Sequence, residues 1–262
     1  MGRRNLKDRH ILITGASGGI GRALALKLAP YQTHLLLVSR REPELVELAR
    51  ELETLGVASA NILAGDITVA TVRDQAIHWI QNNWGCLDML VNNAGISAHG
   101  RFAESNEETL RRILEVNFFA AVELTSQAIP SLRESSDSAV VNVCSILGHR
   151  GIPYNNEYCA SKFALRGWSE AIRPELSKVG VDVLLVSPGT IETDFFDHLI
   201  TKADTTPWGK QRGIPPEKVA DQIIRALQRR KTEIYPNWRG RLLVLLNRFF
   251  PRLVDRIMRR YG

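Results

Sequence analysis

The sequence predicts an α/β fold organised on one doubly wound parallel sheet. Short runs rich in Val, Ile and Leu alternate with longer segments of helical periodicity along most of the 262 residues. The first six of these runs are apolar almost throughout, as is typical of strands that helices cover on both faces. Because strand and helix alternate, we expect parallel strands joined by helical crossovers.

The predicted elements follow one another without an internal repeat, a low-complexity segment or a linker. Strands are expected at residues 11–14, 34–39, 60–64, 89–92, 139–143, 182–187 and 233–235. Helices are expected at residues 19–29, 43–55, 69–84, 107–129, 157–179 and 216–230. The alternation lapses in the irregular stretch 188–215 and after Pro236. We therefore predict one domain over residues 1–236, extended by residues 237–262.

The charge of the chain is unevenly distributed. The net charge of +6 equals the excess of the segment from Ile234 onward, in which seven arginines stand against Asp255 alone. The remaining residues balance 27 basic against 27 acidic side chains. Nothing in the bulk of the domain therefore favours a nucleic-acid partner.

The cysteines and the apolar segments bear on the compartment. Cys86, Cys144 and Cys159 have neither metal-site spacing nor the even number of a disulfide framework, which predicts a reducing compartment and no bound metal. The longest aliphatic run, residues 242–246, is too short to span a bilayer. The N-terminus lacks the apolar segment of a targeting peptide. We expect a cytoplasmic protein, with peripheral membrane contact left open.

A glycine-rich turn follows the first predicted strand, where residues 14–21 read TGASGGIG. Glycines let the backbone turn tightly and let a pyrophosphate approach the N–H groups at the helix start, whose dipole favours an anion. The spacing is Gly-x-x-x-Gly-x-Gly, which differs from the Gly-x-Gly-x-x-Gly fingerprint. We predict a nucleotide site, with a plain tight turn as the alternative. The residues assigned to it are Gly15, Ser17, Gly19, Ile20 and Gly21.

The end of the second strand favours NADP(H) over NAD. An NAD site has an acidic residue here to hold the ribose hydroxyls, whereas an arginine accommodates a 2′-phosphate. In this chain Ser39 is followed by Arg40 and Arg41. A guanidinium suits phosphate well, so Ser39 and Arg40 are assigned to the cofactor. The alternative is that both arginines belong to a solvated loop.

The third and fourth strands end in further candidate cofactor residues. Parallel strands present their carboxyl ends at one edge, where open α/β sheets bind ligands. Asp66 can accept from an adenine amino group, and Ile67 follows it. Asn92 can cap its strand beside the cofactor, and the small Ala94 and Gly95 allow a flat ring to approach. The alternatives are a helix N-cap for Asp66 and simple turn chemistry after Asn92.

A tyrosine and a lysine lie four residues apart on the fifth predicted helix. Tyr158 and Lys162 therefore project from one face. A nearby ammonium is expected to lower the pKa of the phenol from its usual value of about 10, so that the tyrosine can exchange a proton near neutrality. Ser145 ends the fifth strand at the same edge, where its hydroxyl can bind a substrate oxygen.

Taken together and in order, these motifs resemble a classical short-chain dehydrogenase/reductase over roughly residues 8–235. They are residues 14–21 and 92–95, Ser145, Tyr158 with Lys162, and Pro188-Gly189. The resemblance implies a single-domain Rossmann fold with strand order 3-2-1-4-5-6-7. It also implies hydride exchange between nicotinamide and a carbonyl or secondary alcohol. The arginines after the second strand favour NADP(H) as that cofactor.

The resemblance further implies roles for particular residues. Tyr158 would be the general acid/base, Lys162 would stabilise the phenolate and hold the nicotinamide ribose, and Asn117 would anchor a water that links Lys162 to solvent. The turn after the sixth strand would bracket the carboxamide. Its implied contacts are Pro188, Gly189, Ile191 and Thr193. The family commonly forms dimers or tetramers through its fourth and fifth helices.

The substrate is the least determined part of the prediction. Ile146, Tyr154 and Phe195 join Ser145 and Tyr158 as candidate substrate contacts. The irregular stretch 188–215 lies where a lid would form. Its aromatic side chains favour an apolar substrate, unless the loop only packs its own hydrophobic residues.

The C-terminal segment has arginines interleaved with bulky apolar residues in two predicted helices around Pro251. Basic amphipathic helices of this kind bind anionic membrane surfaces. The same side chains can instead cover the substrate cleft or a partner subunit. The leading function is thus an NADP-dependent oxidoreductase; the alternatives are a catalytically silent NADP(H)-binding redox sensor and a membrane-surface scaffold.

Overall fold

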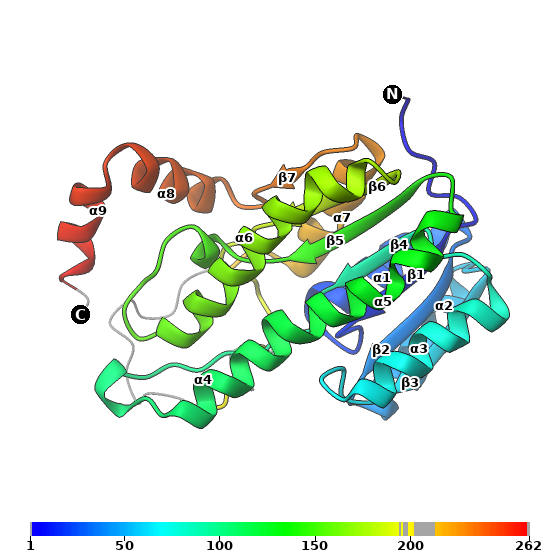
Figure 1. The fold of residues 1–262 in the computed structure, drawn as a ribbon, viewed down its shortest axis with the longest axis horizontal. Helices are drawn as coiled ribbons and strands as arrows, with labels where there is room; N and C mark the ends of the chain where they lie inside the picture. The colour runs from blue at the N-terminus through cyan, green and yellow to red at the C-terminus, as the bar shows by residue number, and fades with distance from the viewer. Residues whose placement is uncertain (1, 194, 196–198, 202–212, 261–262) are drawn as a thin grey trace.

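One seven-stranded parallel sheet forms the centre of the protein (Figure 1). The structure, a computed structural model, describes residues 2–193, 195, 199–201 and 213–260. The strand order is β3-β2-β1-β4-β5-β6-β7, which confirms the predicted fold class and topology. The strands are β1 His10–Thr14, β2 His34–Ser39, β3 Ser59–Ala64, β4 Met89–Asn92, β5 Ser138–Val143, β6 Val181–Val186 and β7 Glu233–Ile234.

Helices cover both faces of the sheet, because its strands are apolar on both sides. In β1, Ile11 and Ile13 face the cluster that includes helices α1, α2 and α7, whereas Leu12 faces α3, α5 and the end of α6. The bounds are α1 Gly19–Leu28, α2 Glu42–Thr54, α3 Ala70–Asn83, α4 Glu107–Leu114, α5 Ala120–Glu134, α6 Asn156–Ser177 and α7 Pro216–Gln228. The short helices are η1 Ala29–Tyr31, η2 Phe102–Glu104, η3 Glu115–Phe119 and η4 Ile146–Gly148.

The helix expected at residues 107–129 differs from the structure in its regularity and its end. It begins as α4, passes through one π-helical turn at η3, and continues as α5 to Glu134. Pro130 does not end it, because Leu132 beyond the proline is fully buried against the sheet. The π turn contains Asn117. Such turns often occur at functional sites, because the extra residue redirects a side chain.

The C-terminal segment forms two helices, α8 Trp238–Phe249 and α9 Pro251–Met258. They extend from the body beyond β7, on the side to which the strands point (Figure 1). The helix break falls at Phe250, where the sequence pattern placed it beside Pro251. Among the described residues, every helix is too short or too polar to cross a lipid bilayer.

Candidate active site

The turn between β1 and α1 has a shape that only glycine allows at two positions. Gly15 has a φ of +64°, and a Cβ there would lie 2.9 Å from the Cα of Ala94. A Cβ on Gly21 would lie 2.5 Å from the carbonyl oxygen of Gly15. The turn, the start of α1 and the loop after β4 therefore pack backbone against backbone. A pyrophosphate fits such a cradle at a helix N-terminus.

The amide of Asn93 fixes this turn. Its Nδ2 donates to the carbonyl oxygens of Thr14 and Gly15, each at 3.0 Å. The Thr14 hydroxyl in turn accepts from the backbone N–H groups of Asn93 and Ala94. Asn93 was missed in the sequence, where Asn92 was assigned to the cofactor. Asn93 is the first residue after β4, so its amide reaches the turn after β1, whereas Asn92 is the last residue of the strand.

The side chain of Asn92, assigned to the cofactor from the sequence, lies in a buried polar chain. Its Nδ2 donates to the hydroxyl of Thr125 and to the Oδ1 of Asn142, the paired residue on β5. Asn142 donates onward to the hydroxyl of Ser169 on α6. This chain ties β4, β5, α5 and α6 together. It is one of the features that hold the helix carrying Tyr158 at a fixed place on the sheet.

At the end of β2, Arg41 is the arginine that reaches the glycine turn. Its Nε donates to the hydroxyl of Ser17 at 3.1 Å, and Ser17 and Ser39 share a hydrogen bond of 2.7 Å. Arg40, the residue assigned from the sequence, is exposed beside this group. The two serines and the Arg41 guanidinium form a polar corner next to the glycine turn. Its donors suit a phosphate.

Asp66 lies at the end of β3, as expected, but its carboxylate has other partners. One oxygen accepts from the N–H and hydroxyl of Thr68, and the other pairs with Arg112 at 2.6 Å. These hydrogen bonds and the nearby guanidinium outweigh partial burial and lower the pKa of Asp66. Ile67 is buried in the core face next to it. The ionised Asp66 thus joins the loop after β3 to α4.

Ser145, Tyr158 and Lys162 lie together beyond the carboxyl end of β5. Ser145 precedes η4, and its hydroxyl accepts from the N–H of Leu147. The same hydroxyl hydrogen-bonds the Tyr158 phenol. The Nζ of Lys162 donates to the carbonyl oxygen of Val143 at 3.0 Å and lies 5.6 Å from the centroid of the Tyr158 ring. The geometry brings three of the four predicted catalytic side chains to one place.

The expected lowering of the Tyr158 pKa is wrong for this geometry. Burial raises the pKa of Tyr158, the neighbouring Cys144 adds to the rise, and the hydrogen bond from Ser145 opposes it. Burial also lowers the pKa of the Lys162 ammonium. The lysine is held by a strand carbonyl rather than by the phenol, so desolvation dominates. Tyr158 is therefore protonated near neutrality.

Asn117 connects the loop after β4 to the catalytic helix. Its Oδ1 accepts from the N–H of Ile96, and its Nδ2 donates to the carbonyl oxygen of Ile96 and to the hydroxyl of Ser161. A Cβ on Gly95 would lie 3.3 Å from the Oδ1 of Asn117 and 3.7 Å from the Nζ of Lys162. Gly95 therefore lies between the two side chains. Its small size keeps them close.

The turn after β6 closes over the glycine turn. The carbonyl oxygen of Pro188 accepts from the N–H of Ile146 at 2.9 Å, so this turn borders the Ser145 loop. A Cβ on Gly19 would lie 3.3 Å from the Cγ2 of Thr193, which shows how closely the two turns approach. Ile191 is buried and pairs with Ile214 in an isolated bridge. A Cβ on Gly189 would contact Asn237 at the start of α8.

The structure describes the candidate substrate contacts Ile146, Tyr154 and Phe195. The ring of Phe195 meets the Tyr158 ring edge-on, with 6.1 Å between centroids. Ile146 packs against Gly240 of α8. Tyr154 has a φ of +62°, and its carbonyl oxygen accepts from the N–H of Gly100. The greater part of the lid expected at residues 188–215 lies outside the described residues.

A buried histidine lies next to the end of β6. His149, at the end of η4, has its Nε2 2.9 Å from the hydroxyl of Ser187 and packs its ring against Tyr235. Burial, with Arg166 as a second cause, lowers the pKa of His149 to about 4. Between about pH 4 and pH 6.5, where an exposed histidine is largely charged, this imidazole is therefore neutral in the folded protein.

We expect this histidine to make the fold sensitive to acid. Its folded pKa lies below the unfolded value, so the unfolded state takes up the proton first, and stability falls as the pH drops from about 6.5 to about 4. The loss expected from His149 is roughly 2–3 kcal/mol. Urea unfolding at about pH 6.5 and about pH 4 measures this change in the free energy of unfolding. We expect His149→Gln to lose less stability between the two pH values than the wild type does. The control is the exposed His78→Gln; equal losses in both variants and the wild type would contradict this assignment.

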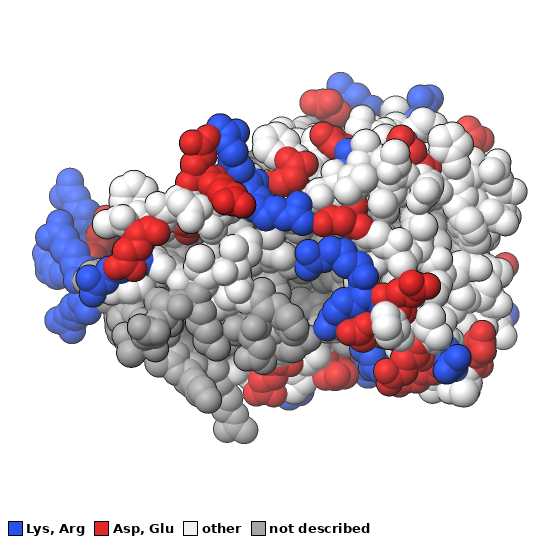
Figure 2. Space-filling view, turned by 90° about the horizontal axis from the view of Figure 1, so that it is seen from below, with Lys and Arg blue, Asp and Glu red and all other residues white. Residues whose placement is uncertain are grey.

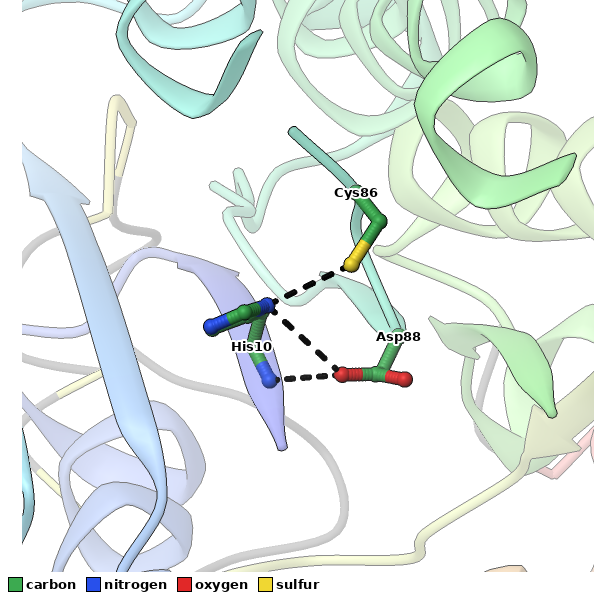
Figure 3. Close-up of side chains that lie close together, drawn as sticks. All are labelled: His10, Cys86 and Asp88. Carbon is green, nitrogen blue, oxygen red and sulfur yellow. Dashed lines mark hydrogen bonds and ion pairs between the residues drawn. The ribbon is translucent and has the colours of Figure 1, made fainter. Parts of the chain in front are cut away.

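A second group of polar side chains lies at the opposite edge of the sheet (Figure 3). The Nδ1 of His10 is 3.5 Å from the sulfur of Cys86 and 4.0 Å from the Oδ2 of Asp88. These are residue types that can bind a metal. The Asp88 carboxylate, however, already accepts from the Arg9 guanidinium, the Ser135 hydroxyl and the His10 N–H. Burial raises the pKa of the Cys86 thiol, so the group is a hydrogen-bonded cluster that joins strand starts.

Comparison with known proteins adds to this geometry. A short chain dehydrogenase family profile matches residues 9–204. The uncharacterized oxidoreductase YxnA of Bacillus subtilis (strain 168) is 34% identical over 262 residues, covering 97% of this chain and 72% of that protein.

Two solved structures illustrate the range of cofactors. L-sorbose reductase from Gluconobacter frateurii, complexed with NADPH and L-sorbose, is 25% identical with a TM-score of 0.78, covering 88% of this chain and 97% of that chain. A short chain dehydrogenase/reductase from Burkholderia phymatum in complex with NAD is 22% identical with a TM-score of 0.85, covering 95% and 96%. At 22% identity, the similarity to the second structure shows a shared fold alone.

Proposed function

The chain belongs to the short-chain dehydrogenase family, and on that premise we propose that it is an NADP(H)-dependent oxidoreductase acting on a carbonyl or secondary alcohol. The observation that supports the proposal most strongly is the grouping of Ser145, Tyr158 and Lys162 at the carboxyl edge of the sheet. This group stands beside a glycine turn shaped for a pyrophosphate. An acid/base, a positioning hydroxyl and a cofactor cradle suit hydride exchange at one carbon.

The residues around the glycine turn fit a dinucleotide. We assign the pyrophosphate to the backbone at Gly15–Gly21, and the 2′-phosphate to the corner formed by Ser17, Ser39 and the guanidiniums of Arg40 and Arg41. The carboxamide is assigned to the turn of Pro188, Gly189, Ile191 and Thr193, and the adenine to the loop of Asp66 and Ile67. When bound, the nicotinamide supplies or accepts the hydride.

The protein's own contribution is proton transfer and orientation. The Ser145 hydroxyl, already bonded to the Tyr158 phenol, is placed to hold the substrate oxygen against that phenol. Because burial raises its pKa, Tyr158 retains its proton and can donate it to the oxygen of a carbonyl under reduction. In the reverse reaction, oxidation of the alcohol, the phenolate would take the proton back. The Lys162 ammonium, fixed by the Val143 carbonyl, would stabilise the charge that develops on Tyr158.

The replacement of the donated proton is assigned to Lys162 and Asn117. Both side chains border Gly95, and both are buried. A water held by Asn117 would link the ammonium to solvent. The hydrogen bonds of Asn117 to Ile96 and Ser161 support this proposal, because they fix the amide beside the lysine.

An apolar substrate is the class we propose. Phe195 lies edge-on to Tyr158, and Ile146 follows Ser145 directly. The test is NADPH oxidation with aliphatic, aromatic, steroid and sugar carbonyls, with NADH as the control cofactor. Turnover is expected with NADPH and a ketone or aldehyde of apolar character. A protein that binds NADPH tightly and oxidises it with none of these classes would instead support the redox-sensor alternative.

The cofactor preference gives a separate prediction. The double variant Arg40→Ala/Arg41→Ala removes both guanidiniums from the 2′-phosphate corner, and each charged hydrogen bond contributes about 1.5–3 kcal/mol. We expect the KM for NADPH to rise about 10-fold to 100-fold or more, with little change in the KM for NADH. Arg50→Ala, an exposed arginine of α2, is the matched control. Equal effects on both cofactors would contradict the 2′-phosphate assignment.

Self-association is also proposed, as a homodimer or homotetramer, through the family's fourth and fifth helices, which here are the continuous helix α4–α5 and helix α6. The exposed Phe119 and Phe163 support it, since both lie on the helical layer that includes α5 and α6. A cytoplasmic location remains a proposal as well.

A further inference from the structure

Helices α8 and α9 expose a stripe of large apolar side chains. On α8 the stripe follows the spacing i, i+4, i+7, i+8 and i+11, which places its members within about 100° of one another around the helix. Trp238 is 71% exposed and Phe249 is 68% exposed, values that are high for such large apolar residues. We call the following set the tail stripe: Trp238, Leu242, Leu245, Leu246 and Phe249 on α8, with Leu253 and Ile257 on α9.

The opposite side of α8 is built to pack on the body of the protein. A Cβ on Gly240 would lie 2.7 Å from the Cγ2 of Ile146, so the helix backbone sits directly on η4. Asn247 donates to the carbonyl oxygen of His149 and accepts from Arg150, which also pairs with Asp255 of α9 at 2.7 Å. These contacts fix the orientation of both helices. Because the tail stripe lies on the other side of α8 from these contacts, it faces away from the body.

Seven arginines flank the tail stripe, and all of them are exposed. Across the part of the chain that the structure describes, none of the seven is within ion-pair distance of a carboxylate, and the segment's single acidic residue, Asp255, is paired with Arg150. Figure 2 shows the resulting group of basic side chains at the end of the molecule occupied by α9. The arginines are Arg239, Arg241, Arg248, Arg252, Arg256, Arg259 and Arg260.

We propose that the tail stripe and its arginines dock on the surface of an anionic lipid bilayer. Apolar side chains of this length can enter the boundary between headgroups and acyl chains, while flanking guanidiniums extend to lipid phosphates. The helices are too short and too polar to cross the bilayer, so they would lie along its surface. This proposal goes beyond the oxidoreductase function and does not depend on it.

A second copy of the chain fits this surface less well. In a two-fold symmetric contact the same patch meets itself, so the unpaired arginines of one copy would face those of the other. Like charges brought together without carboxylates repel each other. Anionic headgroups supply the opposite charge that the segment lacks. Charge complementarity therefore favours the bilayer.

Vesicle flotation with the full chain tests the proposal. The probes are vesicles of phosphatidylcholine alone and of phosphatidylcholine with roughly 30% phosphatidylserine, a composition that gives a negative surface potential. We expect the wild type to float with the anionic vesicles and to be released by high salt, which screens the charges. The variant Leu245→Glu/Phe249→Glu is expected to lower the bound fraction about tenfold or more.

The control is Leu55→Glu, which changes a leucine at the end of α2 that is about as exposed as Leu245, and this variant is expected to bind as the wild type does. Arg252→Gln/Arg256→Gln/Arg259→Gln tests the charge separately and is expected to weaken binding to anionic vesicles alone. An unchanged circular dichroism spectrum and urea unfolding midpoint show that each variant is folded. No flotation of the wild type, or equal flotation of wild type and Leu245→Glu/Phe249→Glu, would overturn the proposal. So would light scattering in which that variant dissociates an oligomer, because the stripe would then belong to a second copy.

Discussion

Tyr158→Phe is expected to lower kcat for carbonyl reduction by roughly 10²-fold to 10⁴-fold, the range that a positioned general acid contributes. Phenylalanine keeps the ring that packs against Phe195 but removes the phenol proton that we assign to the substrate oxygen. NADPH affinity is expected to stay within a few-fold. Stability is expected to change by about 1 kcal/mol, the cost of one hydrogen bond. Steady-state kinetics, cofactor titration and urea unfolding measure the three quantities.

The control for this variant is Tyr31→Phe, which removes a phenol that accepts a hydrogen bond from Gln228, far along the chain from the proposed site. It is expected to leave kcat unchanged. A Tyr158→Phe protein with wild-type turnover would remove Tyr158 from the mechanism. A protein that lost NADPH binding together with turnover would show that the tyrosine acts mainly on the cofactor.

Gly21→Ala is expected to have the largest effect on cofactor binding. The new Cβ would lie 2.5 Å from the Gly15 carbonyl oxygen and 2.6 Å from the Nδ2 of Asn93, so the backbone of the turn must move. We expect the Kd for NADPH to rise at least about 100-fold and stability to fall by about 1–3 kcal/mol, as is typical of overpacking. Calorimetric titration and urea unfolding check these values.

Gly167→Ala is the matched control, because the same Gly-to-Ala change is expected to stabilise the protein at this position. Gly167 lies inside α6, and a Cβ there meets nothing within 4 Å. Alanine in a helix interior is expected to stabilise the protein by about 0.5–1 kcal/mol and to leave NADPH affinity unchanged. If Gly21→Ala bound NADPH as well as Gly167→Ala does, the glycine turn would not be the pyrophosphate site.

The fold was predictable because its determinants are local. Strands β1, β2, β4, β5 and β6 are buried along most of their length, and some helices begin at typical residues, such as Asn106 before α4 and Pro215 before α7, so the alternation was readable along the chain. The strand order came from the resemblance to a family rather than from periodicity. The π-helical turn at Asn117 was not predictable, because a one-residue widening leaves the helical pattern almost unchanged.

The grouping of the candidate catalytic residues was predictable, and their environment was less so. Ser145, Tyr158 and Lys162 carry a recognisable spacing and order. Which of the two adjacent amides, Asn92 or Asn93, bonds to the turn after β1 depends on where β4 ends, and a sequence pattern does not locate a strand end to the residue. The choice between Arg40 and Arg41 likewise depends on the path of a loop.

The pKa of Tyr158 shows why spacing alone is insufficient. Four residues on a helix bring Tyr158 and Lys162 to one face, but the Nζ of Lys162 bonds to the Val143 carbonyl on a different element. Desolvation then outweighs the attraction that the sequence suggested. Long-range contacts of this kind are set by tertiary packing. The same holds for α8, whose inner face is defined by Ile146 and His149 nearly a hundred residues earlier.

The central claim, that the Ser145–Tyr158–Lys162 group protonates a carbonyl that receives a hydride from NADPH, is tested most directly by isotope transfer. The protein is incubated with NADPH deuterated at nicotinamide C4 and the carbonyl panel, and products are analysed by mass spectrometry. We predict one deuterium on the former carbonyl carbon with the wild type and almost none with Tyr158→Phe. Equal transfer by both proteins, or no transfer by a wild type that binds NADPH, would contradict the claim.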